Sequence, residues 1–364
     1  MNGYGNYPDL DQVKRILVIK LRHHGDVFLT SPVFSILKGR LPKTRIFAYI
    51  YQETLPMLEG HPAIEGFHLY DSKWKSLPVL QRVFRELSLI RQIRKNRFDM
   101  IINLTDCDRG DFVALASRAR YRVGLAPERR GFKYRPNLYT HIVKRCQKPR
   151  HMLEQNLDAL RRIGIFPSAE ERDLFLHIPQ SARTSIDRHL QKADLNRHSY
   201  ILIHPTSRWL FKCWSIEKVA LLIHEFNKIG HRIVLSSAPD KKELSMIEQI
   251  ISLCSDIPIL NLAGKLSLKE LPALIQTCSC LVCIDSLPMH IASALKVPTV
   301  ALFGPSSEEA WGPWNNPYGR VIAKSFPCRP CNLDGCGGGK VCDCLEQISV
   351  ESVLHEVRGL LRKR

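Results

Sequence analysis

Short apolar runs rich in Val, Ile and Leu alternate along the chain with longer segments of helical periodicity. In the first half we expect strands at residues 15–21, 45–50, 66–70, 99–104 and 123–125, and helices at 26–40, 77–95 and 152–163. In the second half we expect strands at 200–204, 231–236, 257–260, 280–284 and 297–303, and helices at 214–229 and 350–361. Strands that alternate with helices form a parallel sheet covered on both faces. The pattern therefore predicts an α/β fold of two doubly wound parallel-sheet lobes facing across a cleft.

The region between the two series, residues 167–196, is charged and has no long apolar run, so we interpret it as a linker. A chain of 364 residues is long for one core and suits two domains of similar size. We expect the domains to be 1–175 and 176–364.

Composition narrows the class of protein. The apolar share of 45% and the charged share of 24% are typical of soluble globular proteins. No apolar run is long enough to span a bilayer, and the N-terminus lacks the apolar core of a signal peptide, so we expect a cytoplasmic protein. Lys and Arg exceed Asp and Glu by 53 − 35 = 18. This excess favours polyanionic partners, but without a nucleic-acid-binding signature we expect no nucleic acid among them.

The most informative segment covers residues 281–307, where a buried strand, a polar turn, a helix, a second strand and a Gly-Pro loop follow one another. Ligands of open parallel sheets bind outside the carboxyl ends of the strands, next to helix N-termini, where backbone N–H groups favour phosphate. The segment therefore predicts a nucleotide-type ligand. The residues expected at that edge are Asp285, Ser286, His290 and Gly304.

A second polar loop, residues 204–214, follows the first strand of the second half. Thr206 and Ser207 supply hydroxyls, and Lys212 supplies a positive charge for a diphosphate and for the charge that develops as it leaves. The alternative is an ordinary loop with a surface lysine. We favour phosphate binding because this loop and the 281–307 segment lie on the same predicted sheet edge.

Asp26 follows Gly25 where the first strand passes into the first helix. One interpretation is a helix N-cap, a common role for Asp. The other is a carboxylate at the sheet edge that takes a proton from an acceptor hydroxyl.

Twelve cysteines are present, and seven lie scattered through the expected strands and helices, where reduced thiols are expected. The other five could hold a structural Zn²⁺ or remain reduced in a Gly-rich loop, and the irregular spacing leaves both interpretations open. These five are Cys328, Cys331, Cys336, Cys342 and Cys344. Two further patterns are dismissed: residues 335–341 lack the required Gly and Ser/Thr of a phosphate loop, and Asp106-Cys107-Asp108 lies outside the expected nucleotide lobe.

Residues 16–32, 204–214 and 285–305 resemble those of the ADP-heptose lipopolysaccharide heptosyltransferases, and the resemblance covers nearly the whole chain. It is most similar to the heptosyltransferase III group, through Pro205-Thr206-Ser207-Arg208-Trp209, Lys212-Cys213-Trp214, Asn103-Leu104-Thr105-Asp106 and Asp285-Ser286-Leu287-Pro288-Met289-His290.

This resemblance implies a GT-B fold of two Rossmann-like domains, with an acceptor-binding domain first and a nucleotide-sugar-binding domain second. It implies inverting transfer of L-glycero-D-manno-heptose from ADP-heptose to a heptose of the inner core. Asp26 would be the general base, and Lys212, Thr206 and Ser207 would hold the diphosphate. Asp285, Ser286, His290 and Gly304 would line the donor site, with no metal and no further cofactor required. Relatives often have Thr-Gly where this chain has Ser286-Leu287, so a left-handed backbone at Leu287 would be costly.

The implied partners are the nucleotide sugar and a lipid-anchored core acceptor at the cytoplasmic face of the inner membrane. The alternatives are a type I or II heptosyltransferase, a GT-B enzyme that uses another nucleotide sugar, and a non-catalytic module that binds polyanions or membranes. Basic residues of the first half are acceptor-side candidates: Arg118, Arg120, Arg122, Arg129, Arg130 and Lys133.

Overall fold

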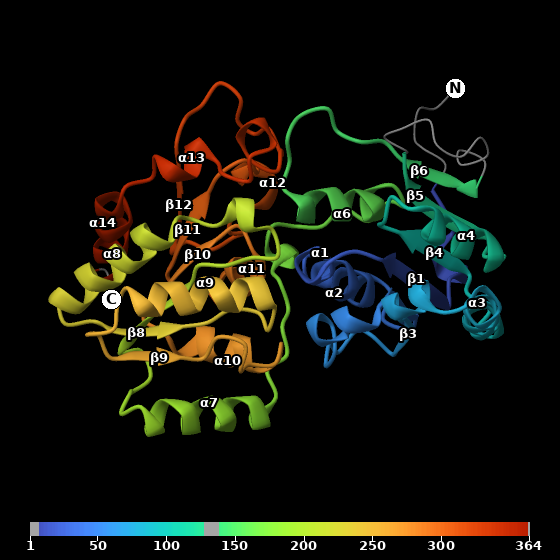
Figure 1. Ribbon diagram of the computed structural model, residues 1–364. Helices are drawn as coiled ribbons and strands as arrows, with labels where there is room; N and C mark the ends of the chain where they lie inside the picture. The colour runs from blue at the N-terminus through green and yellow to red at the C-terminus, as the bar shows by residue number, and fades with distance from the viewer. Residues whose placement is uncertain (1–6, 127–137, 363–364) are drawn as a thin grey trace. The chain divides into compact units, whose positions relative to one another are not determined.

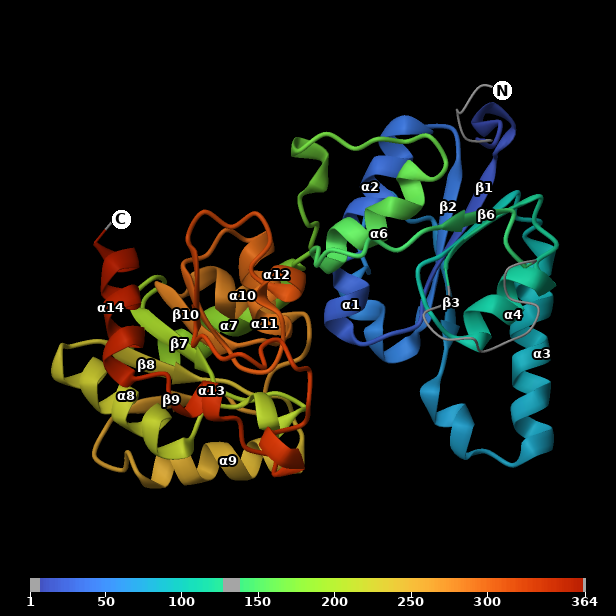
Figure 2. The same ribbon diagram turned by 90° about the horizontal axis from the view of Figure 1, so that it is seen from above.

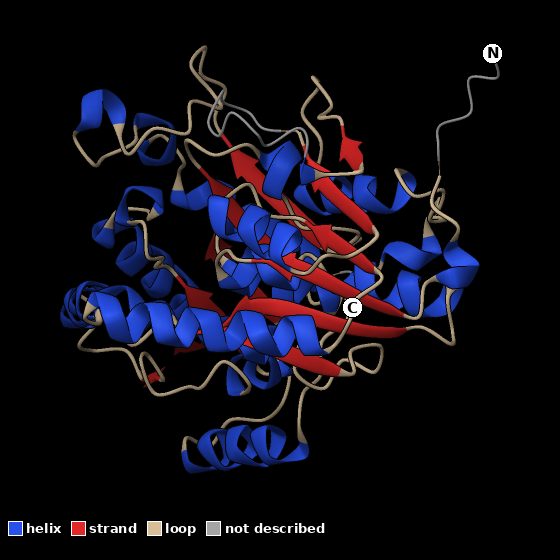
Figure 3. Cartoon of the chain, turned by 90° about the vertical axis from the view of Figure 1, so that its right-hand side faces the viewer, coloured by secondary structure: helices blue, strands red, loops and turns tan. Residues whose placement is uncertain are grey.

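The computed structural model describes residues 7–126 and 138–362, which form two compact units, Met1–His177 and Ile178–Arg364. The division falls next to the boundary expected after residue 175. Each unit contains one six-stranded sheet in which all neighbouring strands are parallel, with helices on both faces (Figure 1 and Figure 3). The predicted α/β class of two doubly wound parallel sheets is confirmed. Arg129, Arg130 and Lys133 lie outside the described residues.

In the first unit the strand order is β3-β2-β1-β4-β5-β6. This is the strand order of a doubly wound dinucleotide-binding sheet. The direction in which successive strands are added reverses between the two central strands, β1 and β4. The strands are β1 (Arg15–Lys20), β2 (Arg45–Tyr51), β3 (Gly66–Tyr70), β4 (Met100–Asn103), β5 (Tyr121–Leu125) and β6 (His141–Val143). The helices are η1 (Leu10–Gln12), α1 (His24–Phe28), α2 (Ser31–Arg40), η2 (Gln52–Met57), η3 (Ser72–Ser76), α3 (Val79–Lys95), α4 (Asp108–Ala116), α6 (Met152–Arg161) and η4 (Glu170–Arg172).

The second unit repeats this arrangement in the order β12-β11-β10-β7-β8-β9, so its reversal lies between β7 and β10. The strands are β7 (Tyr200–His204), β8 (Arg232–Leu235), β9 (Ile259–Asn261), β10 (Cys280–Ile284), β11 (Thr299–Phe303) and β12 (Gly319–Ala323). The helices are α7 (Gln180–Lys192), η5 (Leu210–Lys212), α8 (Ile216–Lys228), α9 (Lys241–Ser252), α10 (Glu270–Thr277), α11 (Leu287–Ala294), α12 (Glu308–Trp311), η6 (Cys336–Gly338), α13 (Asp343–Glu346) and α14 (Val350–Leu361).

The central strands are buried on both faces, which explains why they are continuous apolar runs rather than alternating ones. Helix α14 has one apolar stripe, in which Val350, Val353, Leu354, Val357 and Leu360 join the core of the second unit. This core also contains Cys342, Cys344 and Leu345, so the C-terminal segment is part of the unit rather than a loose tail.

Several elements differ from the sequence-based expectation. The helix expected at 26–40 is two helices, α1 and α2, because Pro32 near the start of α2 cannot continue a helix from α1. The linker expected at 167–196 contains α7, whose buried face has only Ala182, Ile186 and Leu190 and was too weak to identify. The edge strands β6 and β12 were not expected, because one is very short and the other is only partly buried.

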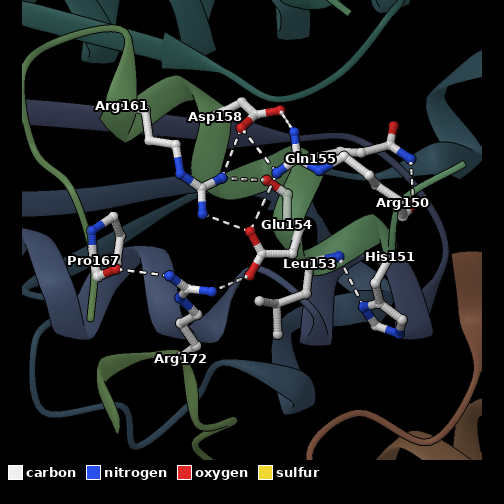
Figure 4. A network of polar contacts seen from close by, with 9 residues as sticks. All are labelled: Arg150, His151, Leu153, Glu154, Gln155, Asp158, Arg161, Pro167 and Arg172. Atoms are coloured by element: carbon white, nitrogen blue, oxygen red, sulfur yellow. Dashed lines mark hydrogen bonds and ion pairs between the residues drawn. The ribbon is translucent and has the colours of Figure 1, made fainter. Parts of the chain in front are cut away.

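A network of ion pairs secures α6 at the end of the first unit (Figure 4). Glu154 on α6 accepts from Arg150, Arg161 and Arg172, and Asp158 accepts from Arg150 and Arg161. Burial raises the pKa of Glu154, but the hydrogen bond from Arg161 and the three guanidinium charges outweigh it and lower the pKa below its usual value. The network therefore ties α6 to the segment that follows it.

Among the described helices, none has both the length and the apolar character needed to cross a bilayer.

Candidate active site

Both sheets bring their central loops to the carboxyl edge, where the strand order reverses. Open α/β sheets bind ligands in the crevice at this point. In the second unit the loops after β7 and β10 meet there, and in the first unit the loops after β1 and β4 do. The loops expected to carry the chemistry are therefore those at the two reversal points.

An ion pair joins the two central loops of the second unit. Lys212, the last residue of η5, places its Nζ 2.6 Å from Oδ2 of Asp285, which follows β10. The side chain of Asp285 is 7% exposed and that of Lys212 is 23% exposed. The structure thus brings together two of the predicted donor-site residues, which are 73 positions apart in sequence.

The start of α11 lies directly after Asp285. Ser286 precedes the helix and donates a hydrogen bond to the carbonyl oxygen of Ile284, at 3.3 Å. Leu287 is the first helical residue, so this turn does not need the left-handed backbone that would favour glycine. His290 is buried, one turn into the helix. The departure from Thr-Gly at Ser286-Leu287 therefore does not disturb the local backbone.

The hydroxyls of Thr206 and Ser207 are engaged within the protein. Thr206 is fully buried and donates to Glu243 Oε2 at 2.6 Å, while Ser207 donates to the carbonyl oxygen of Trp209 and accepts from its N–H. Glu243 is itself 3% exposed and lies in the first turn of α9, behind the N-cap Asp240. Sequence reasoning missed Glu243, although the Asp-x-x-Glu spacing is that of a capping box.

His204, the last residue of β7, is also part of this edge. Its Nδ1 lies 2.9 Å from the hydroxyl of Ser236, at the end of β8, and burial lowers its pKa to about 4. His204 is therefore neutral at physiological pH and serves as a hydrogen-bonding residue between two neighbouring strand ends.

Close packing leaves no room for a side chain at Gly304, which directly follows β11. A Cβ at this position would lie 2.6 Å from Cγ and Cδ1 of Leu345 in α13. The carbonyl oxygen of Gly304 accepts a hydrogen bond from Nε of Arg329 at 2.6 Å. The glycine thus lets the C-terminal segment pack beneath the loop, a reason that the sequence pattern did not reveal.

In the first unit, Asp26 lies in the first turn of α1, and His23 is the N-cap. The N-cap interpretation of Asp26 is therefore wrong. Its side chain is partly exposed, and within residues 7–126 and 138–362 no hydrogen bond or ion pair engages its carboxylate. A carboxylate in this state is able to accept a proton from an incoming hydroxyl.

Beside Asp26 lies a buried lysine that sequence reasoning passed over. Lys20 ends β1, is 4% exposed, and donates from Nζ to the carbonyl oxygen of Leu104 at 3.1 Å and to Oδ1 of Asn156 at 3.0 Å. Burial lowers its pKa to about 8, opposed by the charge of Asp26. The available signal was a charged residue at the end of an otherwise apolar strand.

The loop after β4 faces a basic pocket in the same unit. Asp106 pairs with Arg145 at 2.7 Å, so it is engaged by a side chain of the first unit rather than held for a metal. The pocket has a volume of about 270 Å³ and one acidic residue. Its lining residues are Val143, Lys144, Arg145, Cys146, Arg150, Asp158 and Arg162.

The described acceptor-side candidates lie elsewhere. Arg118 and Arg120 precede β5, and Arg122 is its second residue, so all three lie at the amino edge of the sheet, opposite α1. Arg122 donates to the carbonyl oxygens of Ala119 and Leu138, and Arg120 donates to Gln12. That these three contact the acceptor stays a prediction, and the basic residues at the carboxyl edge are those of the pocket after β6.

The five C-terminal cysteines do not form a metal site. Cys342 and Cys344 are buried in the core, and burial raises the pKa of Cys342 to about 12, which favours the neutral thiol. Cys328 and Cys336 are exposed. In the described part of the chain, no three His, Cys, Asp or Glu residues are arranged to hold a metal ion. The zinc interpretation does not fit this arrangement.

The family model that matches residues 86–341 is glycosyltransferase family 9 (heptosyltransferase). The chain belongs to this family. The matched stretch includes Lys212, Asp285 and Gly304, whereas Asp26 precedes it. A family 9 chain is a glycosyltransferase, so the enzyme class predicted from the sequence is confirmed.

Individual relatives agree with this assignment. Lipopolysaccharide heptosyltransferase 3 of Escherichia coli is 32% identical over 296 residues, which cover 81% of this chain and 85% of the relative. A family 9 glycosyltransferase of Veillonella parvula superposes with a TM-score of 0.81 at 23% identity, covering 99% of this chain and 100% of its own. The E. coli heptosyltransferase WaaC, solved with ADP-2-deoxy-2-fluoro heptose, gives a TM-score of 0.71 at 15% identity, covering 95% and 99%. The expected GT-B fold is confirmed.

Proposed function

We propose that this family 9 enzyme transfers a heptose from ADP-heptose, with inversion, to a heptose of the lipopolysaccharide inner core, as heptosyltransferases of type III do. The observation that carries the proposal is the Lys212–Asp285 ion pair at the reversal point of the second sheet, directly before the N-terminus of α11. The 32% identity to E. coli heptosyltransferase 3 supports the choice of type, and the ADP-sugar bound to WaaC supports the choice of donor.

On the donor side, the diphosphate lies against the N-terminus of α11 and Lys212. Backbone N–H groups at a helix start and an ammonium group stabilise the negative charge that grows as ADP departs. Asp285 repels phosphate, so in the loaded enzyme it orients Lys212 and accepts hydrogen bonds from sugar hydroxyls. Thr206 and Ser207 hold the β7 loop in shape through Glu243 and Trp209, while His290 and Gly304 line the same site.

On the acceptor side, Asp26 removes the proton from the attacking hydroxyl. The freed oxygen forms a bond to the anomeric carbon as the bond from that carbon to the ADP oxygen breaks, which inverts the configuration. Lys20 lies nearby, and the negative charge of Asp26 opposes the lowering of the lysine pKa by burial. The pocket after β6 is lined by four cations and one acidic residue, and this excess of positive charge suits a phosphorylated core, while Arg145 and Arg150 also pair with Asp106 and Asp158.

No metal ion takes part in this mechanism, because Lys212 and the helix N-terminus carry the leaving-group charge. We further propose that the enzyme works in the cytoplasm at the inner face of the inner membrane, where its acceptor is held by a lipid anchor. Its surplus of 18 positive charges suits both the anionic surface and the acceptor.

The donor assignment is tested by nucleotide-induced thermal stabilisation. ADP should stabilise the protein more than UDP or GDP, and Lys212→Met should reduce the ADP effect and lower kcat/KM by about 10²–10³-fold. The matched control is Lys192→Met, at the end of α7, which should behave as wild type. Equal stabilisation by all three nucleotides would reject the ADP donor.

The acceptor is tested by transfer from ADP-heptose to a set of truncated core oligosaccharides, followed by linkage analysis of the product. Type III activity requires transfer to a core that already carries heptose. Transfer to a heptose-free core would assign type I instead. Salt-dependent polyanion binding without any transfer would assign the non-catalytic module.

A further inference from the structure

We propose that α3 and the preceding turn η3 form a membrane-docking surface that inserts into an anionic lipid bilayer. The inference rests on the proposed function in one respect, that the acceptor is lipid-anchored. The observations that carry it belong to the first unit alone.

The first half of α3 exposes an apolar face. Leu80 is 85% exposed, Val79 75% and Phe84 74%, and Val83 and Leu87 are each nearly half exposed. These five residues are either adjacent in sequence or three or four positions apart, which places all of them on one side of the helix. The helix packs onto its unit through Leu89 and Ile93 on another side. Surface leucines occur singly in many proteins, but five apolar side chains on one helix face need a partner.

The same face becomes cationic along the helix. Leu80, Phe84 and Leu87 continue at helical spacing into Arg91 and Arg94, both exposed. Between residues 72 and 95 seven side chains are Lys or Arg and one is acidic. The acidic residue, Glu86, is engaged by Arg82, Arg109 and Tyr70. Within residues 7–126 and 138–362, no acidic side chain pairs with Arg91 or Arg94. Exposed Leu and Phe next to such cations are the features of a helix that lies in a membrane interface.

The position of this surface suits a lipid-anchored acceptor. η3 follows the carboxyl end of β3, so the apolar start of α3 leaves from the edge of the sheet where α1 carries Asp26. Figure 2 shows η3 and the first turns of α3 extending past the end of β3. Trp74 in η3 packs edge-on against Tyr70 at 4.9 Å, which holds the turn on its strand. Docking through η3 and α3 would bring a lipid-anchored acceptor close to the edge of the sheet that carries Asp26.

The positive charge of this surface favours an anionic bilayer over a second copy of the chain as its partner. Two copies packed through this face would bring their Arg and Lys side chains together at close range, which costs free energy. An anionic bilayer offers hydrocarbon to Leu80 and Phe84 and phosphate to Arg91 and Arg94.

The test is co-sedimentation with vesicles of phosphatidylethanolamine and phosphatidylglycerol, against vesicles of phosphatidylcholine. The wild type should bind the anionic vesicles more tightly, and Leu80→Ser/Phe84→Ser should weaken that binding by about tenfold or more. Arg91→Gln/Arg94→Gln should weaken it and reduce its dependence on salt. The control Leu221→Ser/Leu253→Ser removes two exposed apolar side chains of the second unit and should bind as wild type.

Transfer assays separate this inference from the proposed function. Leu80→Ser/Phe84→Ser should retain wild-type kcat/KM on a soluble truncated acceptor and lose activity on an acceptor held in vesicles. Unchanged vesicle binding by this variant overturns the inference. A wild type that is dimeric, with the variant monomeric, overturns it as well. Absence of wild-type transfer to any core acceptor would reject the proposed function while leaving the vesicle result to stand by itself.

Discussion

At the scale of single residues, the first unit places two charges of opposite sign at the end of β1 in different surroundings. Asp26 is partly exposed, and among the described residues it has no hydrogen-bond partner. Lys20 is buried and held by Leu104 and Asn156. Burial lowers the pKa of Lys20 to about 8, and the negative charge of Asp26 opposes this shift. The first unit thus combines an accessible carboxylate with a buried lysine whose charged form is only weakly favoured.

Replacement of the base tests its role directly. Asp26→Asn should lower kcat by about 10²–10⁴-fold, because the amide cannot take the acceptor proton, and should leave the affinity for ADP unchanged. Steady-state transfer assays and ADP titration measure the two quantities. Asp108→Asn is a matched control, since Asp108 is an exposed carboxylate at the start of α4 on the same sheet edge. Transfer at the wild-type rate by Asp26→Asn would assign the base elsewhere.

The lowered pKa of Lys20 predicts how the free energy of unfolding depends on pH. Its folded pKa of about 8 lies below the usual value of 10.5, so between these two values the unfolded chain binds more protons than the folded one. The contribution of Lys20 to the free energy of unfolding should rise by about 3 kcal/mol from pH 8 to pH 10.5. Urea unfolding of wild type and Lys20→Met over this range should show a difference that grows with pH. A constant difference would mean that Lys20 titrates normally.

At the scale of elements, the C-terminal segment supports the donor loop. Leu345 in α13 occupies the space that a side chain at residue 304 would need, and Arg329 bonds the backbone of the same glycine. Buried Cys342 donates from Sγ to the carbonyl oxygen of Phe211 in η5. The segment thus contacts the loop after β11 and the turn that presents Lys212.

Gly304→Ala should destabilise the protein by about 1–3 kcal/mol through overpacking against Leu345. Combining it with Leu345→Ala should cost less than the sum of the two single changes, because the smaller side chain makes room for the new methyl group. Gly359→Ala, on α14 where an added Cβ meets nothing within 4 Å, should stabilise by up to about 1 kcal/mol. Chemical denaturation measures all four variants. Strict additivity of the pair would show that Leu345 is not the obstacle.

The sequence predicted those elements whose pattern is local. β3, β7, β10 and α14 have the expected bounds, because their apolar residues are continuous or strictly periodic. The short β6, the partly buried β12 and the sparsely apolar α7 lacked such a pattern. The site residues were identifiable as polar groups after buried strands. Their partners were not, because the contacts of Lys20 with Asn156 and of Gly304 with Leu345 join segments far apart in the chain.

At the scale of the whole molecule, the two units share one strand order but differ in the chemistry of their carboxyl edges. The first presents a partly exposed carboxylate and a basic pocket, and the second presents a lysine held by a buried carboxylate next to a helix start. An inverting displacement needs one base and one group that stabilises the leaving charge. The division of these tasks between two sheets of equal topology agrees with the proposed transfer.

Transfer should not depend on a divalent metal, since Lys212 and the start of α11 supply the positive charge that a metal ion would otherwise provide. Treatment with EDTA, followed by metal analysis and an activity assay, should leave kcat/KM unchanged, and added Mg²⁺ should not raise it. Loss of activity that Mg²⁺ or Zn²⁺ restores would require a metal-assisted mechanism and a different arrangement of the acidic or cysteine residues.

The core of the second unit includes five side chains of α14, which lies at the end of the described chain. During synthesis on the ribosome, the first unit can fold while the second is still being made, whereas the second lacks part of its interior until α14 has been made. Growing chains that stall before α14 should therefore carry a folded acceptor half and an open, protease-sensitive donor half. Nucleotide binding would appear only once α14 has joined this core.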